Sequence, residues 1–491
     1  MNSELILAID IGTSSTRTAF FDLCGERIAS TMAQQPYPLI TSADGGAEID
    51  PPVLLGAVLH CLESSVRALR ADPALRGRPI AGIGVSCFWH SLLGCDARGS
   101  AITRIFTWAD SRCRDDAAEL REKLSEKDTH ARTGCMLRSS FWPAKLRWLR
   151  RVGQRKFSAV KLWMSPAEWL QTTLAGEANC SLAMASGTGL FNPTKLAWDE
   201  ELLALGRISP TQLRPVSDAP TATGGLLATQ FPELKGVPWF PGIGDGAASN
   251  LGSGATRPGI AAINVGTSAA VRVVRQGKAV RPPLGLSHYR LDAQRCLLVG
   301  AISNAGNLRA WCVREFNLAN EAEIEAELAR RPGPGHGLIV LPFWTTERAP
   351  VWNESDSGTI HGITLHTTAL DLLQAVTEAT YHRLARIVEL IETVESTPPK
   401  FVVSGGIQRS PSAVQRLADV LGQTIYPNDE MEASLRGAAV FVLGQLGLPE
   451  PEAQIGRAVR PRGKFAKQYA AERDKQQALE DRGCALSDVR L

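Results

Sequence analysis

Short apolar runs that end in polar loops recur along the chain and predict buried β-strands. Residues 5–9 are continuously apolar, and 17–22 form a second strand after a turn at Gly12, so the two predict a hairpin. Residues 80–87 form another apolar strand that ends in an aromatic and polar stretch, and strand ends are where α/β sheets bind ligands. The same pattern predicts later strands at 338–341 and 401–403.

Apolar residues at helical spacing predict helices between these strands. A helix over 54–69 follows Asp50-Pro51-Pro52, which is a typical helix start, and a long helix is predicted over 370–393. Other amphipathic helices are predicted at 114–124, 143–151, 414–421 and 434–446. Strands that alternate with helices are typical of an α/β protein.

A run of small residues with a proline at 252–258 predicts the boundary between two domains. We expect one domain over 1–254, a second over 255–455, and a charged tail over 456–491. The tail holds nine Lys or Arg against five Asp or Glu and few large apolar residues, so we expect a solvated helical or frayed segment. A nucleic-acid-binding tail is the less favoured alternative.

The same short pattern occurs at 9–14 and again at 263–268. Each copy is an apolar strand that turns on a glycine followed by two hydroxyl residues, and such turns present N–H and O–H donors to an anion. One copy would be typical of a simple hairpin, but repetition at the start of each domain favours two loops that close on one polyphosphate. The first copy holds Asp10 and the second holds neutral Asn264. This asymmetry fits one nucleotide with one Mg²⁺ ion.

Composition excludes several other classes of function. A formal net charge of +3 over 491 residues gives no reason to expect a nucleic-acid-binding surface. The ten cysteines include no Cys-x-x-Cys pair and no zinc-like spacing, so we expect reduced thiols in a cytoplasmic protein. The first residues lack the basic segment of a signal peptide. No apolar run approaches the ~20 residues that span a bilayer, so no membrane contact is expected.

Asp245 lies between two glycines just before a predicted helix. A carboxylate in this position could accept a proton from an attacking hydroxyl, as the catalytic aspartate does in other phosphoryl-transfer enzymes. An aspartate is also a common N-cap of a helix. The pattern alone leaves both interpretations open.

Two aromatic and polar segments are candidates for sugar recognition. They contain Trp89 with His90, and Asp110 with Arg112. Sugars are bound by flat apolar surfaces together with paired polar groups. Residues of these segments also have structural alternatives: His90 could be a core histidine, Trp108 could be core packing, and Asp110 and Arg112 could pair with each other.

A nucleotide site would have to be built from separated loops, because the chain has no Walker A motif and no G-x-G-x-x-G motif. Gly405 and Gly406 follow a predicted strand and precede a helix, where a backbone can pass close to an anion or a flat ring. Gly306 is a similar candidate. Each of these signals is weak by itself.

Taken together and in order, these stretches resemble the FGGY carbohydrate kinases over about residues 4–450. The resemblance rests on AIDIGTSSTRTAFFD, the 108–112 segment, ASGTGLFNPTKLAWDEELL, GIGDGAASNLGSGA, INVGTSAAVR, ERAPVWN and VVSGGIQRSPSAVQRLADVLGQ. It implies a two-domain actin-like (ribonuclease-H-like) ATPase fold of the α/β class with an interdomain cleft. It also implies an enzyme that transfers the γ-phosphoryl group of ATP, with Mg²⁺, to a sugar-like alcohol.

The resemblance implies a role for each matching residue. Asp245 is the general base and contacts the substrate, Asp10 is the metal-site aspartate, and Trp89 and His90 contact the substrate. The nucleotide-binding positions are Gly12, Thr13 and Ser14 in the first loop, Gly266, Thr267 and Ser268 in the second, and Gly306, Gly405, Gly406 and Ser410 beyond them.

Within the family, the chain looks most similar to gluconate kinases, through FTWADSR, RTGC and ASGTGLFNPTKLAWDEELL. Gluconate carries a carboxylate, so Arg112 and Lys145 are candidate cationic partners, although both could be structural. Trp89 stands where a methionine often precedes the histidine, which alters the substrate wall. The alternatives are a xylulose, ketose or polyol kinase, and a non-catalytic nucleotide- or sugar-binding regulator on the same fold. The expected partner is a small molecule, and a homodimer is compatible with an enzyme of this size.

Overall fold

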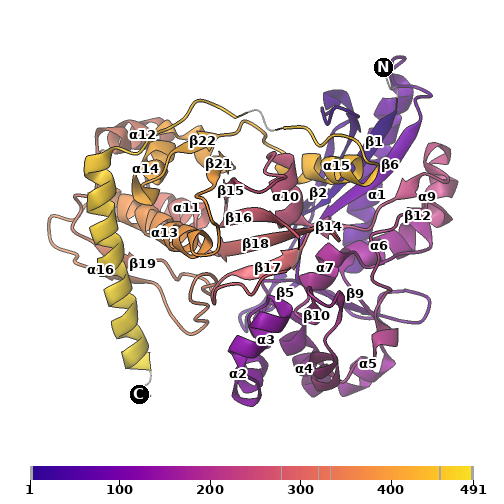
Figure 1. Ribbon diagram of the computed structural model, residues 1–491, viewed down its shortest axis with the longest axis horizontal. Helices are drawn as coiled ribbons and strands as arrows, with labels where there is room; N and C mark the ends of the chain where they lie inside the picture. The colour runs from indigo at the N-terminus through magenta and orange to yellow at the C-terminus, as the bar shows by residue number, and fades with distance from the viewer. Residues whose placement is uncertain (1–3, 278, 319, 332, 453–454, 488–491) are drawn as a thin grey trace.

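The protein consists of two α/β domains, each built around a mixed β-sheet (Figure 1). The computed structural model describes residues 4–277, 279–318, 320–331, 333–452 and 455–487. In Figure 1 the N-terminal domain lies on the right and the C-terminal domain on the left. This is the two-domain actin-like, ribonuclease-H-like arrangement that the sequence resemblance implied.

The first sheet has the strand order β12-β13-β6-β1-β2-β3, with β14 paired to β6. Its central strand β1 pairs antiparallel with β2 and parallel with β6. Every residue of β1 is buried, as expected for a strand covered on both faces of the sheet. The strands of this sheet are β1 Leu5–Ile11, β2 Ser15–Asp22, β3 Ala33–Pro36, β6 Ile80–Cys87, β12 Thr221–Ala222, β13 Pro238–Trp239 and β14 Ile243–Gly244.

Helices and short strands complete the first domain. The short strands are β4 Ile40–Thr41, β5 Ala47–Ile49, β7 Leu93–Cys95, β8 Ile105–Phe106, β9 Leu162–Met164, β10 Phe191–Asn192 and β11 Ala197–Trp198. The helices are α1 Pro51–Ala71, α2 Arg114–Lys123, α3 Glu126–Thr133, α4 Trp142–Val152, α5 Gln154–Ala159, α6 Pro166–Ala175, α7 Leu182–Ser186, α8 Glu200–Gly206, α9 Gly225–Gln230 and α10 Asp245–Gly252.

The second sheet repeats the design of the first, with the order β17-β18-β16-β15-β21-β22. Its strand β15 pairs antiparallel with β16 and parallel with β21, as β1 does with β2 and β6. The strands are β15 Ile260–Val265, β16 Ala269–Gln276, β17 Ser287–Arg290, β18 Arg295–Ile302, β19 Ile339–Leu341, β20 Thr359–His361, β21 Lys400–Ser404 and β22 Ile425–Pro427, of which β19 and β20 form a separate pair. The helices are α11 Gly306–Glu315, α12 Glu321–Arg330, α13 Ala369–Glu392, α14 Pro411–Leu421, α15 Ala433–Gln445 and α16 Gly463–Ser487.

Helix α15 comes late in the chain but packs on the first sheet, against β1 and β6, and on α10 (Figure 1). Glycines allow this close approach: a Cβ on Gly437 would collide with the backbone of Ala248, and one on Gly252 with the backbone of Ala433. By residue number α15 falls within the second predicted domain, 255–455. The contacts of this helix therefore cross the boundary that composition indicated.

Helix α16 does not behave as the solvated tail that its charge composition suggested. Tyr469 is fully buried in the second core, and Gln476 and Glu480 are almost fully buried. Glu480 forms an ion pair with buried Arg383 of α13, with 2.6 Å between Oε2 and Nη1. One side of α16 is thus polar and yet packed, because its polar groups find partners inside the domain. Residues 488–491 of the predicted tail lie outside the described residues.

Helix α1 is the one described helix that is long and apolar enough, by length and composition alone, to cross a membrane. Polar residues interrupt its apolar sequence, so it is not a continuous apolar run. Nine of its residues are buried, and the helix packs against β2 and β3. This burial is that of a core helix of a folded domain.

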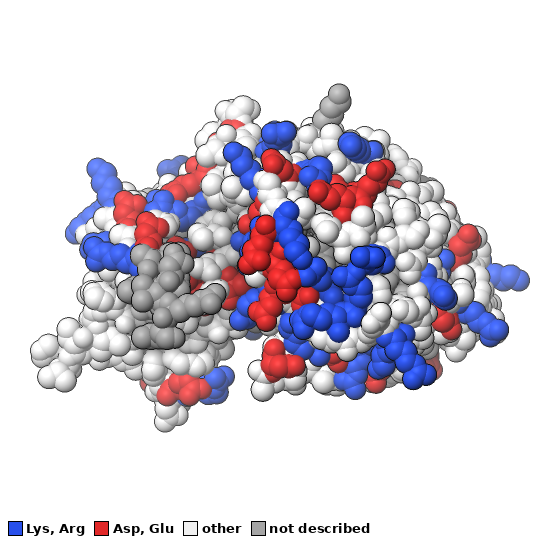
Figure 2. Space-filling view, turned by 90° about the horizontal axis from the view of Figure 1, so that it is seen from below, with Lys and Arg blue, Asp and Glu red and all other residues white. Residues whose placement is uncertain are grey.

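Charges of both signs lie next to one another on the face shown in Figure 2. At the base of the first domain, Arg151 of α4 pairs with Asp116 of α2 at 2.6 Å, and Arg147 pairs with Glu119. The basic residues of α4 are therefore partly neutralised by acidic residues of the neighbouring helix.

Candidate active site

Asp10 and Asp245 come from two parallel strands, β1 and β14, that both pair with β6 in the first sheet. Strand pairing sets Asp10 of β1 opposite Ser86 of β6, and Ser86 opposite Ile243 of β14. Asp245 follows two residues later, as the first residue of α10. Both carboxylates therefore lie at the carboxyl ends of parallel strands, the edge where α/β sheets bind ligands.

The carboxylate of Asp245 does not cap its helix. The N-cap position is taken by Gly244, and no side chain makes a capping hydrogen bond there. Oδ1 of Asp245 accepts a hydrogen bond of 2.8 Å from the adjacent Gly246 N–H. Burial raises the pKa of Asp245, while the charge of nearby Arg272 acts to lower it. A carboxylate with a raised pKa is suited to accepting a proton near neutral pH.

Trp89 and His90 form an aromatic wall beside Asp245. The Trp89 ring lies against Gly244, where a Cβ would collide with it, and its Nε1 donates to Ala183 O at 3.1 Å. Tyr289 of β17 completes the wall from the second domain, with its ring centroid 4.7 Å from that of Trp89 and 5.7 Å from that of His90. The wall therefore combines residues of both domains.

His90 is held as a neutral ring. Burial lowers its pKa to about 3, so the ring is uncharged at neutral pH. Nδ1 lies 2.5 Å from Gly187 O, and because a carbonyl oxygen accepts, Nδ1 carries the proton. Nε2 is then a hydrogen-bond acceptor, which suits it to receive a hydroxyl of a ligand.

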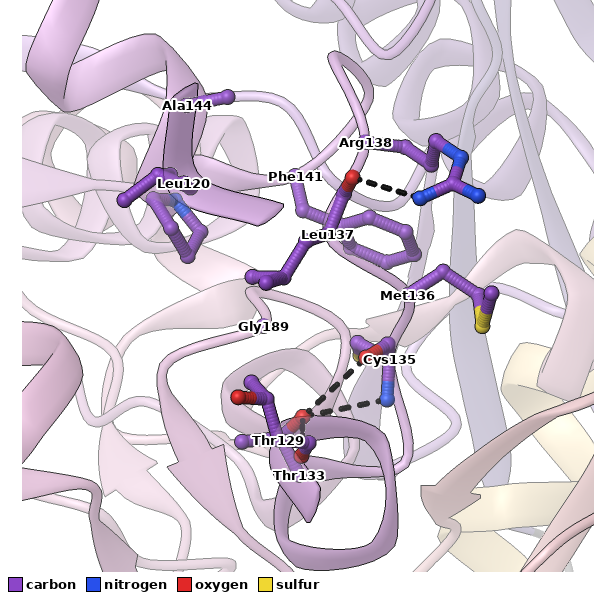
Figure 3. A pocket seen from close by; sticks show the side chains of 11 residues that line it. Leu120, Thr129, Thr133, Cys135, Met136, Leu137, Arg138, Phe141, Ala144 and Gly189 are labelled. Carbon is purple, nitrogen blue, oxygen red and sulfur yellow. Dashed lines mark hydrogen bonds between the residues drawn. The ribbon is translucent and has the colours of Figure 1, made fainter. Parts of the chain in front are cut away.

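Phe141 joins this wall to a closely packed group of residues in the first domain. Phe141 packs edge-on against His90 with centroids 4.8 Å apart, and it also lines the small pocket drawn in Figure 3. In that pocket the Thr133 hydroxyl accepts from Cys135 N–H at 3.2 Å. The pocket leaves no space for a water molecule, so it belongs to this packing and is too small for a ligand.

The two cations predicted to meet a substrate carboxylate already have acceptors in the protein. Arg112 pairs with Asp110 and Glu48, and its guanidinium lies 4.5 Å from the centre of a Trp148 ring. The structural alternative for Asp110, pairing with Arg112, is the arrangement found. Lys145 is fully buried and donates from Nζ to two backbone carbonyls, at 2.5 and 2.9 Å.

Two other arginines, Arg272 and Arg348, lie beside Asp245, and the sequence analysis gave neither a role. A Cβ added to Gly246 would lie 2.8 Å from Nε of Arg272. Arg348 acts on the pKa of both Asp245 and His90 through its charge, and its guanidinium stacks on Trp108 at 4.9 Å. Both lie in stretches that carried the family resemblance, INVGTSAAVR and ERAPVWN, and that was the available signal.

Asp10 has the surroundings of a site for Mg²⁺. Ser86 Oγ donates to its Oδ1 at 2.7 Å, and Arg17 Nη1 donates to its Oδ2 at 3.3 Å. Burial, assisted by the negative charge of Asp245, raises the pKa of Asp10 to about 6, and a cation between the two carboxylates would relieve that repulsion. The described residues contain no cluster of three His, Cys, Asp or Glu side chains. Mg²⁺ fits this donor set, because it commonly uses one or two carboxylates with water and phosphate oxygens.

A cavity of about 900 Å³ opens between the second loop and helices α11–α14. It is lined by five of the predicted nucleotide positions, Gly266, Thr267, Gly306, Gly406 and Ser410. Its volume is in the range of cofactor and drug-sized ligand sites. Gly306 and Gly405 are close to the loop backbone: a Cβ on either would lie 2.6 Å from a carbonyl oxygen, of Gly266 or of Val265.

The first loop also closes in a tight turn, although its closing hydrogen bond reaches one residue further than that of the second loop. Gly12 N–H donates to Ser15 O at 3.0 Å, and Gly266 N–H donates to Ser268 O at 2.9 Å. Thr13 Oγ1 accepts from Trp108 Nε1 at 3.1 Å, and Ser14 is exposed. Both loops thus have the tight turn predicted for phosphate binding.

Family models match almost the whole chain. The N-terminal domain of the FGGY family of carbohydrate kinases matches residues 5–252, and the C-terminal domain of the same family matches 261–443.

Individual relatives differ in the substrates that their names give. The chain is 27% identical to a gluconokinase of Bacillus subtilis (91% of this chain, 88% of the relative) and 30% identical to a glycerol kinase of Rhodospirillum centenum (94% and 93%). A xylulose kinase structure from Lactobacillus acidophilus superposes with a TM-score of 0.88 at 24% identity, covering 98% of this chain and 99% of that one. That structural match supports the fold. The two family models together establish that this chain belongs to the FGGY family of carbohydrate kinases and is a phosphotransferase.

Proposed function

We propose that this kinase transfers the γ-phosphoryl group of ATP to a hydroxyl of a sugar acid, with gluconate as the substrate. The observation that carries the proposal is Asp245, a partly buried carboxylate at the same strand edge as Asp10, with the Trp89 ring against the glycine that precedes it. Similarity to a gluconokinase over 91% of the chain supports the choice of gluconate. The proposed catalytic and binding roles are those that the family resemblance gave to each residue.

Asp245 acts as the general base in this scheme. Its Oδ1 is held by the Gly246 N–H, so Oδ2 is the oxygen that accepts the proton of the attacking hydroxyl. Removing that proton as the oxygen attacks the γ-phosphorus lowers the barrier, typically by a factor of about 10²–10⁴. The proton moves to Asp245, and ADP leaves with the bridging oxygen of the broken P–O bond.

The phosphate loops and Asp10 handle the triphosphate. Backbone N–H groups and hydroxyls of 12–14 and 266–268 are donors for phosphate oxygens. Asp10 would hold Mg²⁺, which supplies positive charge to the phosphate oxygens when bound. The cavity beside Gly306 and Gly406 would take the adenosine.

The aromatic wall positions the acceptor. Trp89 and Tyr289 offer flat faces for C–H groups, and Nε2 of the neutral His90 offers an acceptor for a hydroxyl. Since the wall uses residues of both domains, it is complete only when the domains are together, which would keep water from the γ-phosphate.

An ADP-release assay with Mg·ATP tests the proposal on gluconate, xylulose, ribulose and glycerol. We expect gluconate to have the highest kcat/KM. Preference for glycerol or for a ketose would keep the kinase and reject gluconate, and it would agree with the 30% identity to a glycerol kinase. No stimulation by any acceptor, in protein that binds ATP, would favour the regulator.

We also propose a cytoplasmic location, where ATP is available. Among the nine cysteines whose side chains the structure describes, none forms a disulfide and eight are buried. Unpaired buried thiols are typical of proteins that stay in a reducing compartment.

A further inference from the structure

Arg272 extends from the second domain to the catalytic carboxylate of the first. It lies on β16, opposite Ala262 of β15 and Val299 of β18. A Cβ on Gly246, the residue after Asp245, would lie 2.8 Å from its Nε and 3.2 Å from its Nη2. The Trp89 ring is 3.0 Å from the same point. The guanidinium therefore faces the part of the site where the acceptor is expected.

The guanidinium of Arg272 lacks acceptors from the protein. Its Nε and Nη1 are buried with no hydrogen-bond partner among the described residues, and no other arginine described has two such nitrogens. Buried donors are nearly always satisfied, and a buried cation without a partner is costly. Such a group at a binding site indicates an acceptor that arrives with the ligand.

We infer that Arg272 binds the carboxylate of the acceptor and thereby selects acidic sugars over neutral ones. The inference rests on the proposed function, in which the acceptor is a sugar acid. The planar guanidinium can donate two parallel hydrogen bonds to a carboxylate, which neutral hydroxyls match poorly. Arg272 takes the place of Arg112 and Lys145 in this role, because those two already donate to protein acceptors.

The charges around Asp245 support an anionic acceptor. Arg348 is a second cation there, held by Ser303 Oγ and Ile302 O at 3.0 Å each. Two guanidiniums thus act on one carboxylate, so this part of the protein has an excess of positive charge that an acidic acceptor can match. A carboxylate on the acceptor restores the balance and leaves Asp245 to accept the proton.

The position of Arg272 on β16 separates it from the phosphate loop. Ser268 ends that loop, and Arg272 lies four residue steps beyond it along the strand, roughly 13 Å at ~3.3 Å per residue. The alternative roles for Arg272 are contact with the transferred phosphoryl group and control of the charge of Asp245. Either role would act on every acceptor equally, whereas carboxylate binding acts on acids alone.

The test compares gluconate with sorbitol, the neutral polyol that has CH₂OH in place of the carboxylate. Steady-state kinetics are measured for the wild type and for Arg272→Gln. We expect kcat/KM for gluconate to fall about 10- to 100-fold, mostly through KM, because a charged hydrogen-bond pair is lost from ground and transition states alike. Sorbitol turnover is expected to stay within about twofold. Arg272→Lys keeps the positive charge but loses the planar pair of donors, so its kcat/KM for gluconate is expected to lie between those of the wild type and Arg272→Gln.

Arg275→Gln is the matched control, since Arg275 lies on the same strand but donates to Val394 O and pairs with Glu395. This variant should leave kcat/KM unchanged for both gluconate and sorbitol. An equal loss on gluconate and sorbitol in Arg272→Gln, or no loss on either, would overturn the inference. ADP binding and thermal melting check that the variants fold. If Arg272→Gln does not fold, the ratio of kcat/KM for gluconate to kcat/KM for sorbitol in Arg272→Lys tests the inference instead. A wild-type protein inactive on every sugar acid would instead refute the proposed function. The wild type is therefore assayed before any variant.

Discussion

The two halves of the molecule share one backbone design but differ at matching positions. Asp10 of β1 pairs across parallel strands with Ser86, and Asn264 of β15 pairs in the same way with Ser404. The serine hydroxyl lies 2.7 Å from the Asp10 carboxylate in the first half and 3.1 Å from the Asn264 amide in the second. A carboxylate in one half is therefore replaced by an amide of the same shape in the other.

This difference shows how two domains with the same sheet design can have different roles in one reaction. The carboxylate half holds Asp10, Asp245 and most of the aromatic wall, and it is the half suited to a metal ion and to proton transfer. The amide half holds the cavity of about 900 Å³ and adds no negative charge beside it at position 264. In the proposed scheme, a triphosphate between them would meet one metal-binding carboxylate, because a second would repel it.

Asp245→Asn should have the largest effect, since it removes the proposed general base. We expect kcat to fall by about 10²–10⁴-fold, the usual contribution of general-base catalysis, with ATP affinity near that of the wild type. Steady-state kinetics and nucleotide binding measure the two quantities. Turnover close to the wild type would exclude Asp245 as the base.

Asp10→Asn gives position 10 the same amide that Asn264 has in the second half, and it should weaken the use of Mg²⁺. We expect turnover at fixed Mg²⁺ to fall at least about tenfold, because metal-ion charge stabilisation is worth several kcal/mol. A Mg²⁺ titration of activity should become shallower. If the titration curve matched that of the wild type, Asp10 would not be the metal ligand.

Asn264→Asp is the reciprocal variant and the control for Asp10→Asn. It adds a carboxylate to the nucleotide half, so ATP binding should weaken by charge repulsion while the Mg²⁺ titration keeps its shape. An increase in ATP affinity would contradict the division of charge between the halves.

Gly306→Ala should affect the nucleotide half alone. Its new methyl group would lie 2.6 Å from Gly266 O, and overpacking of this kind costs ~1–3 kcal/mol. We expect KM for ATP to rise about tenfold and KM for gluconate to stay unchanged. Gly463→Ala, where no heavy atom lies within 4 Å, is the control and should change neither.

The smallest expected effect is a pH dependence of Mg²⁺ use. The pKa of Asp10 is raised to about 6, and its deprotonated form is the one that binds a cation. Falling pH therefore protonates Asp10 and weakens Mg²⁺ binding, so the half-saturating Mg²⁺ concentration should double near pH 6 relative to neutral pH. Mg²⁺ titrations at several pH values measure this, and Asp10→Asn should abolish the dependence.

The sequence predicted what depends on local pattern. The two hairpins, the helix predicted over 54–69 (α1, Pro51–Ala71) and the α/β class follow from apolar periodicity, turn residues and repetition. The glycines at 266 and 306, which short motifs in the sequence singled out, both line the cavity of about 900 Å³.

The contacts missed by the sequence analysis depend on tertiary structure. Spacing along a strand does not show that Arg272 reaches Gly246, or that Arg112 is already held by Glu48. Composition likewise suggested a solvated tail, although Tyr469 and Glu480 are buried. A polar helix face can be packed wherever the rest of the fold supplies partners, and composition does not record those partners.

The late position of α15 in the chain has a consequence for biosynthesis. The first sheet cannot be fully covered until residues 433–445 have left the ribosome, because α15 packs on β1 and β6. The N-terminal half is therefore made long before its last structural element, and it must wait with part of its sheet exposed. Completion of the nascent chain, rather than synthesis of the first half, sets the moment at which that half can reach its native state.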